Sequence, residues 1–300
     1  MNDAIRSELL IDGRRLSYLD FGGAGRPLLA LHGHLAEGAV FGPLAAALGP
    51  EWRVIAPDQR GQGESDRAAD YSREGYLADV EALLDHLGLE SVVLLGHSLG
   101  AVNAYQFAAR HPGRVTAIVN AEGPAALGLD GSHPMAFLLH LPYDASSRDA
   151  LVTALGPAAP YFEDRLRENA DGSWRLPFHP QDMYASEADV HGDHWADWTA
   201  TTCPALVVSG TRGVIPAEQV ARMIARRPGT VLAELDADHM VVTGAAAEFQ
   251  RVVREFLDTV WRVEGGAAAF SSAAPVGLSA PGSGFVEPNP TLGWTQRAAG

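Results

Sequence analysis

Short runs of apolar residues alternate with helical patterns along most of this chain. The runs at 26–33, 91–96 and 203–210 carry apolar side chains at nearly successive positions, which is typical of strands buried on both faces of a parallel sheet. The stretch 73–88 spaces its apolar residues three and four positions apart, as one face of a helix requires. This alternation predicts an α/β protein with a mostly parallel sheet and crossover helices.

The same pattern assigns the remaining elements. Strands are predicted at 7–13 and 14–22, joined as a hairpin at Asp12-Gly13, because this dipeptide suits a tight two-residue turn. The other predicted strands are 52–58, 114–123 and 230–236. The other predicted helices are 101–113, 217–229, 246–262 and an alanine-rich segment that precedes the strand at 52–58.

Residues 124–200 do not follow this alternation. They are rich in Pro, Asp, His and aromatic residues, and we expect them to form an inserted, mainly helical cap on a core made of 1–123 and 201–264. Residues 265–300 contain mostly Ala, Gly, Ser and Pro with almost no charge. Such a segment buries too little apolar surface to offset its ordering entropy, so a disordered tail is expected there.

The charge balance narrows the possible partners. The 300 residues include 22 Lys and Arg against 37 Asp and Glu, which gives a net charge of −15. This charge disfavours binding to nucleic acids and to anionic membranes. All the basic residues are Arg, so chemistry that depends on a lysine, such as a Schiff base or a phosphate-binding loop, is excluded.

Cysteine usage and hydropathy indicate the compartment. Cys203 is the only cysteine, which excludes an internal disulfide and a cysteine metal cluster. The N-terminus lacks the apolar core of a signal peptide, and no apolar run reaches the length of about 18 residues that a membrane span needs. We expect a soluble cytoplasmic protein. Its oligomeric state cannot be read from the sequence.

One motif carries nucleophilic chemistry. Gly96-His97-Ser98-Leu99-Gly100 is a G-x-S-x-G sequence that follows an apolar strand and opens a helix. That context is the one a nucleophile elbow requires, because the sharp turn projects the serine hydroxyl above the sheet. The motif predicts Ser98 as a nucleophile.

With this motif the chain resembles the α/β-hydrolase superfamily, over about residues 5–262. The resemblance implies a cap-bearing serine hydrolase that acts without a cofactor. Residues 28–36 resemble the superfamily's oxyanion loop, so the backbone N–H groups of His34 and Leu99 are expected to bind the oxyanion. Residues 56–66 resemble the loop that braces the elbow, with Gln62 where a histidine is common.

The resemblance also indicates the base. His239 lies in the loop between the last strand and the last helix, where the superfamily keeps its catalytic histidine. A serine hydroxyl needs such an imidazole to remove its proton. Three neighbouring cap residues, His191, Asp193 and His194, raise the question of a metal site. No helix puts both histidines on one face with a third ligand, so no metal is predicted.

The same segment suggests part of the substrate pocket. Trp195 and Trp198 follow these residues in the aromatic, proline-rich cap. Ligand pockets are lined mainly by apolar and aromatic side chains. The two tryptophans are therefore predicted to line a pocket for a small molecule.

The acid is the open question. The superfamily's aspartate usually stands three residues after the strand-ending glycine, Gly210, and that position is Gly213 here. Glu122 ends the strand after the nucleophile's helix, about 4.8 Å from the nucleophile's strand if the two are neighbours. Some haloalkane dehalogenases and the zearalenone-type lactone hydrolases place their acid there. Glu122 is the predicted acid; Glu218, or no acid at all, remains an alternative.

These residues predict a serine hydrolase that cleaves a carboxylic ester or lactone of a medium-sized apolar molecule through an acyl-enzyme. Lactone hydrolysis, C–C bond hydrolysis and perhydrolysis all use this triad. A ligand-binding receptor on the same fold is the alternative from another class. The vacancy at Gly213 favours the receptor, whereas Ser98 and His239 favour the enzyme.

Overall fold

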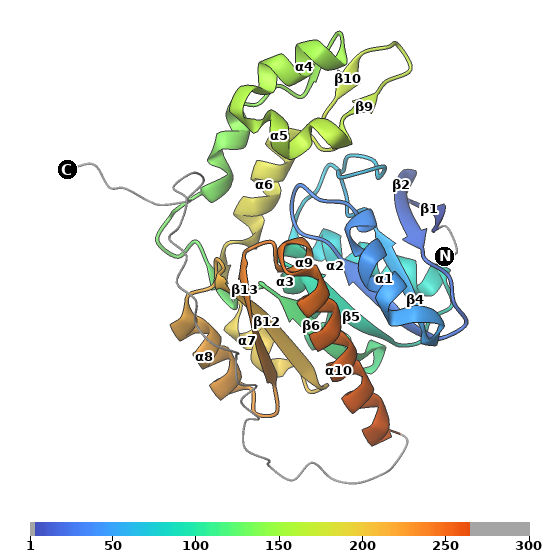
Figure 1. The fold of residues 1–300 in the computed structure, drawn as a ribbon, viewed down its shortest axis with the longest axis vertical. Coiled ribbons are helices and arrows are strands. Elements are labelled where there is room, and N and C mark those ends of the chain that lie inside the picture. The colour runs from blue at the N-terminus through green and yellow to red at the C-terminus, as the bar shows by residue number, and fades with distance from the viewer. Residues whose placement is uncertain (1–3, 265–300) are drawn as a thin grey trace, which may run out of the picture. The chain divides into compact units, whose positions relative to one another are not determined.

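An eight-stranded sheet forms the centre of the computed structural model, which describes residues 4–264 (Figure 1). The strand order is β1-β2-β4-β3-β5-β6-β12-β13. β2 runs antiparallel to both of its neighbours, β1 and β4, and every neighbouring pair from β4 to β13 is parallel. The α/β-hydrolase fold predicted from the sequence is therefore confirmed. The strands are β1 (Ile5–Ile11), β2 (Arg14–Asp20), β3 (Arg26–Leu31), β4 (Trp52–Pro57), β5 (Val92–His97), β6 (Val115–Ala121), β12 (Ala205–Arg212) and β13 (Val231–Asp238).

Successive side chains of the buried strands enter two different apolar clusters, because they point to opposite faces of the sheet. On β5, Leu94 joins the cluster with residues from α2, α3, α7 and α8, and Leu95 joins the cluster with residues from α1 and α10. The sheet is thus covered on both faces, which explains the nearly continuous apolar runs in the sequence. These helices are α1 (Gly42–Leu48), α2 (Arg73–His86), α3 (Leu99–Arg110), α7 (Trp195–Ala200), α8 (Ala217–Arg226) and α10 (Ala246–Glu264).

The β1–β2 hairpin has the turn that its sequence predicts. Asp12 and Gly13 both have positive φ, 50° and 81°. This matches a type I′ turn, which favours Asp-Gly because both central residues must be left-handed.

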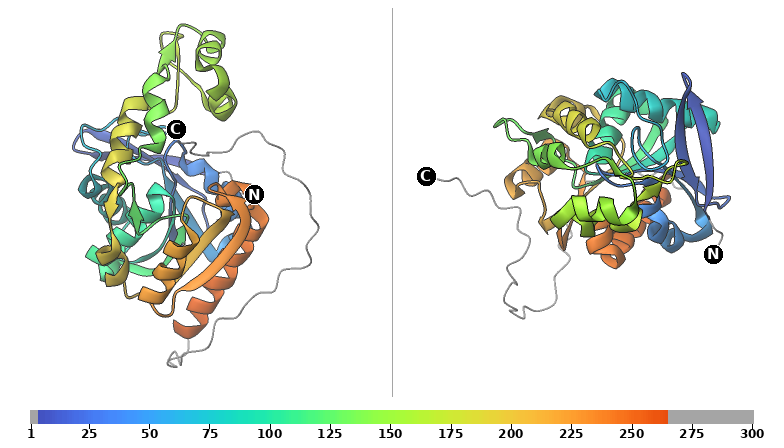
Figure 2. Two further views of the ribbon diagram at one scale, coloured as in Figure 1. Left: turned by 90° about the vertical axis from the view of Figure 1, so that its left-hand side faces the viewer. Right: turned by 90° about the horizontal axis from the view of Figure 1, so that it is seen from above.

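The segment between β6 and β12 contains the predicted cap. It is mainly helical, but it also contains a three-stranded sheet of order β8-β10-β9 and a pair of β7 with β11. These strands are two residues long, too short to show a period in the sequence. Figures 1 and 2 show α4, α5, β9 and β10 beyond one end of the central sheet. The elements are β7 (Ala126–Leu127), η4 (Pro134–His140), β8 (Asp144–Ala145), α4 (Arg148–Leu155), α5 (Ala159–Phe162), η6 (Glu163–Arg165), β9 (Arg167–Glu168), β10 (Trp174–Arg175), α6 (Pro180–Val190) and β11 (Gly192–Asp193).

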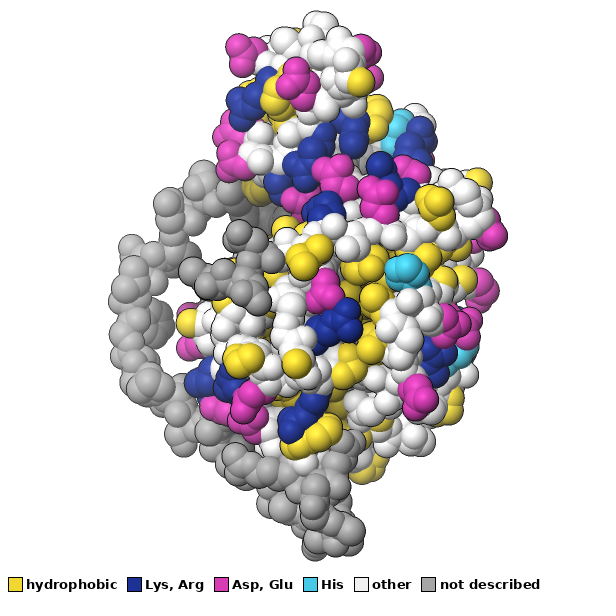
Figure 3. All heavy atoms as spheres, turned by 90° about the vertical axis from the view of Figure 1, so that its right-hand side faces the viewer, with side chains coloured by type: hydrophobic (Ala, Val, Ile, Leu, Met, Phe, Trp, Pro, Cys, Tyr) yellow, Lys and Arg dark blue, Asp and Glu magenta, His cyan; other side chains and the backbone are white. Residues whose placement is uncertain are grey.

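Arginines of the cap bind the loops that follow β3 and β4. Arg165 donates to the carbonyl of Leu35 at 2.5 Å, and Arg167 pairs with Glu37 at 2.6 Å and Glu64 at 2.7 Å. In Figure 3, basic and acidic side chains lie next to one another where the cap meets the core. The cap is thereby fixed over the carboxyl ends of the central strands.

Two further predictions concern the C-terminal tail and membrane-spanning helices. The predicted tail, 265–300, lies outside the described residues. No helix within 4–264 is both long enough and apolar enough to span a membrane.

Candidate active site

Ser98 stands at the sharp turn between β5 and α3. Its backbone has φ 53° and ψ −118°, a conformation that costs a non-glycine residue roughly 1–3 kcal/mol and is found mostly at functional sites. Gly96 and Gly100 make the turn possible, because a Cβ on either one would overlap neighbouring backbone. The Ser98 side chain is half-buried, so its hydroxyl is accessible above the sheet.

His239 reaches this hydroxyl from the loop between β13 and α9 (Val241–Gly244). Its Nε2 lies 3.0 Å from Ser98 Oγ, and its side chain is 29% exposed. The His97 Nε2–H donates to the backbone carbonyl of His239 at 2.8 Å, so the residue before Ser98 fixes the loop that carries His239. Burial lowers the pKa of His97 to about 3, which keeps this ring neutral.

Glu122 meets the other side of His239. His239 Nδ1 lies 3.2 Å from Glu122 Oε2, and the carboxylate is completely buried. The N–H groups of Gly210 and Val214 each donate to it at 2.8 Å, and the Ser209 hydroxyl donates at 3.3 Å. Since a carboxylate only accepts, His239 must carry its proton on Nδ1, which leaves Nε2 free to accept from Ser98.

Gly213 makes room for the carboxylate of Glu122, the candidate acid, which follows β6 and not β12. A Cβ at this position would overlap the carboxylate of Glu122. The turn after β12 therefore has no side chain where the superfamily commonly has its acid, and the Glu122 carboxylate occupies that space. The position of the Glu122 carboxylate therefore requires a residue without a side chain at position 213.

The backbone of Glu122 is as unusual as that of Ser98. Its φ is 55°, which is uncommon for a non-glycine residue. Ser98 and Glu122 follow adjacent strands in register, since His97 pairs with Ala121. Their N–H groups continue the ladder, with Ser98 donating to the carbonyl of Ala121 and Glu122 to that of Val208, each at 2.9 Å. Both candidate residues are thus held at strand ends by the sheet itself.

The loop after β3, which is predicted to bind the oxyanion, lies beside Ser98, since a Cβ on Gly33 would come within 3.1 Å of the Ser98 Cβ. The N–H of Leu99 begins a helix and has no intrahelical partner, and neither it nor the N–H of His34 donates a hydrogen bond within 4–264. The next N–H, that of Leu35, donates to Gln62 Oε1 at 2.7 Å. The His34 side chain is used elsewhere, because its Nε2 lies 2.8 Å from the Ser186 hydroxyl on α6. Burial lowers the pKa of His34 to about 3.

Comparisons with known proteins agree with this geometry. A family model described as the alpha/beta hydrolase fold matches residues 26–244. N-formylmaleamate deformylase of Pseudomonas putida is 30% identical over 82% of this chain and 94% of its own length. The chain belongs to the α/β hydrolase family.

Two further comparisons concern one kind of enzyme. 2-(Acetamidomethylene)succinate hydrolase of Mesorhizobium japonicum is 27% identical to this α/β hydrolase over 79% of the chain and 89% of its own length. The crystal structure of an E-2-(acetamidomethylene)succinate hydrolase matches with a TM-score of 0.73 and 25% identity, over 85% of this chain and all of that chain. The likeness therefore extends over the cap as well as the core.

The two tryptophans of this hydrolase require a correction. Trp198 is fully buried, its indole N–H donates to the carbonyl of Met223 at 3.0 Å, and its ring contacts the edge of Tyr105. Trp195 is 8% exposed and lies against the guanidinium groups of two arginines on α8, Arg222 and Arg226. Both side chains pack α7 against its neighbours in the core. The sequence pattern predicted that they line a substrate pocket, whereas the structure buries both in the core.

Glu218, the alternative acid, and the two aspartates nearest His239 in the sequence are exposed to solvent. Glu218 is exposed on α8, and the Asp236 side chain is 83% exposed and pairs with Arg212. Asp238 is exposed and accepts from the N–H of Met240. Of these four carboxylates, Glu122 is the one in contact with His239.

Sequence reasoning missed residues that support the site from outside the motifs. His97 lies within the elbow motif without a predicted role, and its ring holds the loop of His239. Gln62 was noted as a departure from the family pattern, and it fixes Leu35. Ser186 and Arg165 of the cap gave no signal, because their partners, His34 and Leu35, lie far away in the sequence.

Proposed function

We propose that this α/β hydrolase is a serine hydrolase that cleaves a carboxylic ester or lactone through an acyl-enzyme. The observation that carries the proposal is the continuous line of contacts from Ser98 Oγ to His239 Nε2 at 3.0 Å and from His239 Nδ1 to Glu122 Oε2 at 3.2 Å. Such a line lets a serine lose its proton as it attacks, since the resulting imidazolium is stabilised by the carboxylate.

The reaction follows from these positions. Ser98 Oγ bonds to the substrate carbonyl carbon while His239 Nε2 takes its proton. The N–H groups of His34 and Leu99 then bind the developing oxyanion, where each such donor contributes about 3 kcal/mol. The bond to the leaving oxygen breaks as His239 returns the proton to the alcohol. Water, deprotonated by the same histidine, releases the acid and restores Ser98.

The substrate is proposed to be a medium-sized, largely apolar small molecule. The cap is bound to the oxyanion loop through Arg165 and Leu35, so a ligand at Ser98 would lie beneath it. The cap segment, residues 124–200, is rich in aromatic residues and proline. A cap of this composition suits a mostly apolar ligand with a few polar contacts.

The relatives favour a second candidate, hydrolysis of an amide. N-formylmaleamate and 2-(acetamidomethylene)succinate each contain an amide nitrogen and at least one carboxylate. The same attack by Ser98 would then release an amine in place of an alcohol. The receptor alternative predicts that no substrate is turned over at all.

A substrate panel with a covalent probe separates these possibilities. Wild type and Ser98→Ala are assayed on p-nitrophenyl esters of graded acyl length, lactones of graded ring size and N-acyl amino dicarboxylates. A fluorophosphonate, which labels only an activated serine, is located by mass spectrometry, with Ser146→Ala as the matched control at an exposed loop serine. We expect esters or lactones to turn over and the label to lie on Ser98. Full activity of Ser98→Ala would refute the proposal, and preference for the dicarboxylates would favour the amide.

A further inference from the structure

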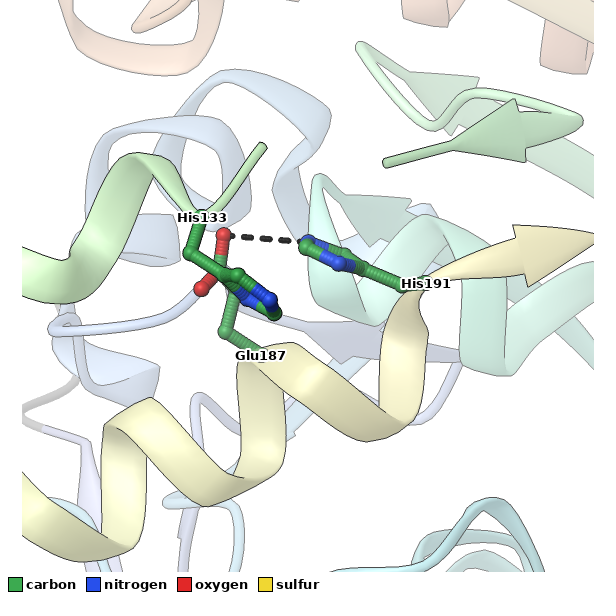
Figure 4. Close-up of side chains that lie close together, drawn as sticks. All are labelled: His133, Glu187 and His191. Atoms are coloured by element: carbon green, nitrogen blue, oxygen red, sulfur yellow. Dashed lines mark hydrogen bonds and ion pairs between the residues drawn. The ribbon is translucent and has the colours of Figure 1, made fainter. Parts of the chain in front are cut away.

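A second group of histidine and carboxylate side chains lies in the cap, away from Ser98. The cap cluster consists of His133, Glu187 and His191 (Figure 4). His133 directly precedes η4, Glu187 lies on α6, and His191 follows the last residue of that helix. The spacing of four residues puts Glu187 and His191 on one side of α6. Each residue offers one ligand atom, and these atoms all lie within 4.8 Å of one another.

The carboxylate of Glu187 is buried and only half satisfied. Its side chain is 5% exposed, and Oε1 lies 3.2 Å from His191 Nε2. Oε2 is buried as well and has no hydrogen bond to any residue that the structure describes. An unpaired buried carboxylate oxygen is strongly unfavourable, because a buried charge needs a partner. Oε2 therefore has the capacity to bind a further ligand, and a cation would supply the missing partner.

The orientation of His191 is fixed by its surroundings. Gly128 has a φ of 63°, and a Cβ there would overlap the Nδ1 side of the His191 ring. Nε2 is consequently the atom that faces Glu187. The ring of His133 lies against that of His191, with centroids 5.0 Å apart and planes 25° from parallel. His133 is exposed, so its side chain is free to rotate toward a bound ion.

The electrostatic setting also favours a cation. His191 caps the carboxyl end of α6, and the carbonyl groups of a helix end carry partial negative charge. The whole chain has a net charge of −15. The residues suspected from the sequence do not join the cluster, because Asp193 accepts from the N–H of Trp195 and His194 contacts the carbonyl of Val190.

We propose that the cap cluster binds one divalent transition-metal ion, with Zn²⁺ as the ion that its donors suit best. Two imidazole nitrogens and one carboxylate oxygen are ordinary zinc ligands, and a water molecule would complete a tetrahedron. Zinc bonds of about 2.0–2.2 Å bring ligand atoms to about 3.3 Å apart. Rotation of the exposed His133 side chain supplies the required approach.

The ion would join two parts of the chain that flank the active site. His133 belongs to the segment that follows Glu122, and α6 also carries Ser186, which contacts His34 of the oxyanion loop at 2.8 Å. Metal binding would therefore hold α6 and this segment together beside the site. The ion is stabilising and takes no part in the attack by Ser98.

Zinc binding to the purified full chain tests this proposal. After removal of metals with EDTA and gel filtration, ZnCl₂ is titrated by calorimetry, bound zinc is measured by mass spectrometry, and Tm is recorded with and without the ion. We expect about one Zn²⁺ per chain and a higher Tm with zinc. His133→Ala and Glu187→Gln should each raise the Kd at least about tenfold, since each removes one ligand.

The matched control is His140→Ala, which removes an exposed histidine from the same 3-10 helix that His133 precedes. This variant should bind zinc as wild type does. Because His133 is exposed, its replacement tests the site even if the Glu187 variant fails to fold. Binding of much less than one ion per chain, an unchanged Kd in His133→Ala, or an equal loss in His140→Ala would overturn the proposal.

Discussion

Within residues 4–264, two glutamates with buried side chains each pair with a partly buried histidine at the same separation but in different surroundings. Glu122 and His239 are 3.2 Å apart, and so are Glu187 and His191. Glu122 accepts from two backbone N–H groups, one hydroxyl and the imidazole. Glu187 has the imidazole alone, and one of its oxygens has no donor in the described structure. A fully satisfied carboxylate can only orient its histidine, whereas a half-satisfied one has capacity for a further ligand.

The backbone beneath each pair differs as well. Glu122 stands at a strained strand end, φ 55°, and its N–H extends the sheet to Val208. Glu187 and His191 are held by the regular spacing of a cap helix. Strain is stored where the surrounding structure over-determines the conformation, often at functional sites. The contrast is the reason for proposing chemistry for the pair in the core and stabilisation for the pair in the cap.

The largest expected effect compares the two histidines. His239→Ala removes the base of Ser98 and should lower kcat on a p-nitrophenyl ester about 10⁴-fold or more. His191→Ala removes a residue of the cap cluster, and its loss should stay below about tenfold. Steady-state kinetics of both variants provide the test. Equal losses would mean that the two pairs do not differ in role.

A smaller effect is expected at the glycine that makes room for Glu122. Gly213→Ala adds a methyl group where the carboxylate lies, so we expect about 1–3 kcal/mol of destabilisation and a loss of roughly 10–100-fold in kcat. Gly113→Ala is the control, because a Cβ there meets nothing within 4 Å. Urea unfolding and ester kinetics measure both. If Gly213→Ala behaves like Gly113→Ala, the contact between Gly213 and Glu122 is not real.

The smallest effect concerns His97, which lies next to the core pair. Burial lowers its pKa to about 3 in the folded protein, below the ordinary value of 6.5. The unfolded chain therefore binds more protons between about pH 3 and 6.5, and the stability that neutral His97 contributes is complete above 6.5 and is lost as pH falls. Within this window it should account for up to about 1.4 kcal/mol per pH unit.

Urea unfolding of wild type and His97→Gln between pH 4 and 7 measures this slope. The variant should lose less stability per pH unit than wild type does. Gly113→Ala, which changes no titrating group, should keep the wild-type slope. An identical slope in His97→Gln would show that His97 is not held neutral.

Much of the fold and the central site could be predicted because their signals are local. The strand predicted at 91–96 is β5 at Val92–His97, and the elbow sequence carries its own glycines. His239 follows from its place between the last strand and the last long helix. The prediction of Glu122 required only that β6 lie beside β5 in a parallel sheet.

What could not be predicted depends on contacts between distant segments. The reason for Gly213 is the carboxylate of Glu122, which belongs to another strand. Trp195 and Trp198 looked like pocket residues by composition, but α7 packs them into the core. Glu187 and His191 share a helical spacing, yet only the fold brings His133 to them. These placements follow from tertiary packing and leave no periodic trace in the sequence.

The central claim is that Glu122 is the acid of this hydrolase, and kcat of Glu122→Gln on a single ester tests it most directly. Both carboxylate oxygens accept from backbone N–H groups, so a glutamine must set its NH₂ group against one of these donors, and it has no negative charge to stabilise the imidazolium of His239. Asp236→Asn and Glu218→Gln are the controls at exposed carboxylates, and urea unfolding verifies that each variant is folded. We predict a fall in kcat of about 10³–10⁴-fold for Glu122→Gln and less than about twofold for the controls. A folded Glu122→Gln protein within about threefold of wild type would contradict the account.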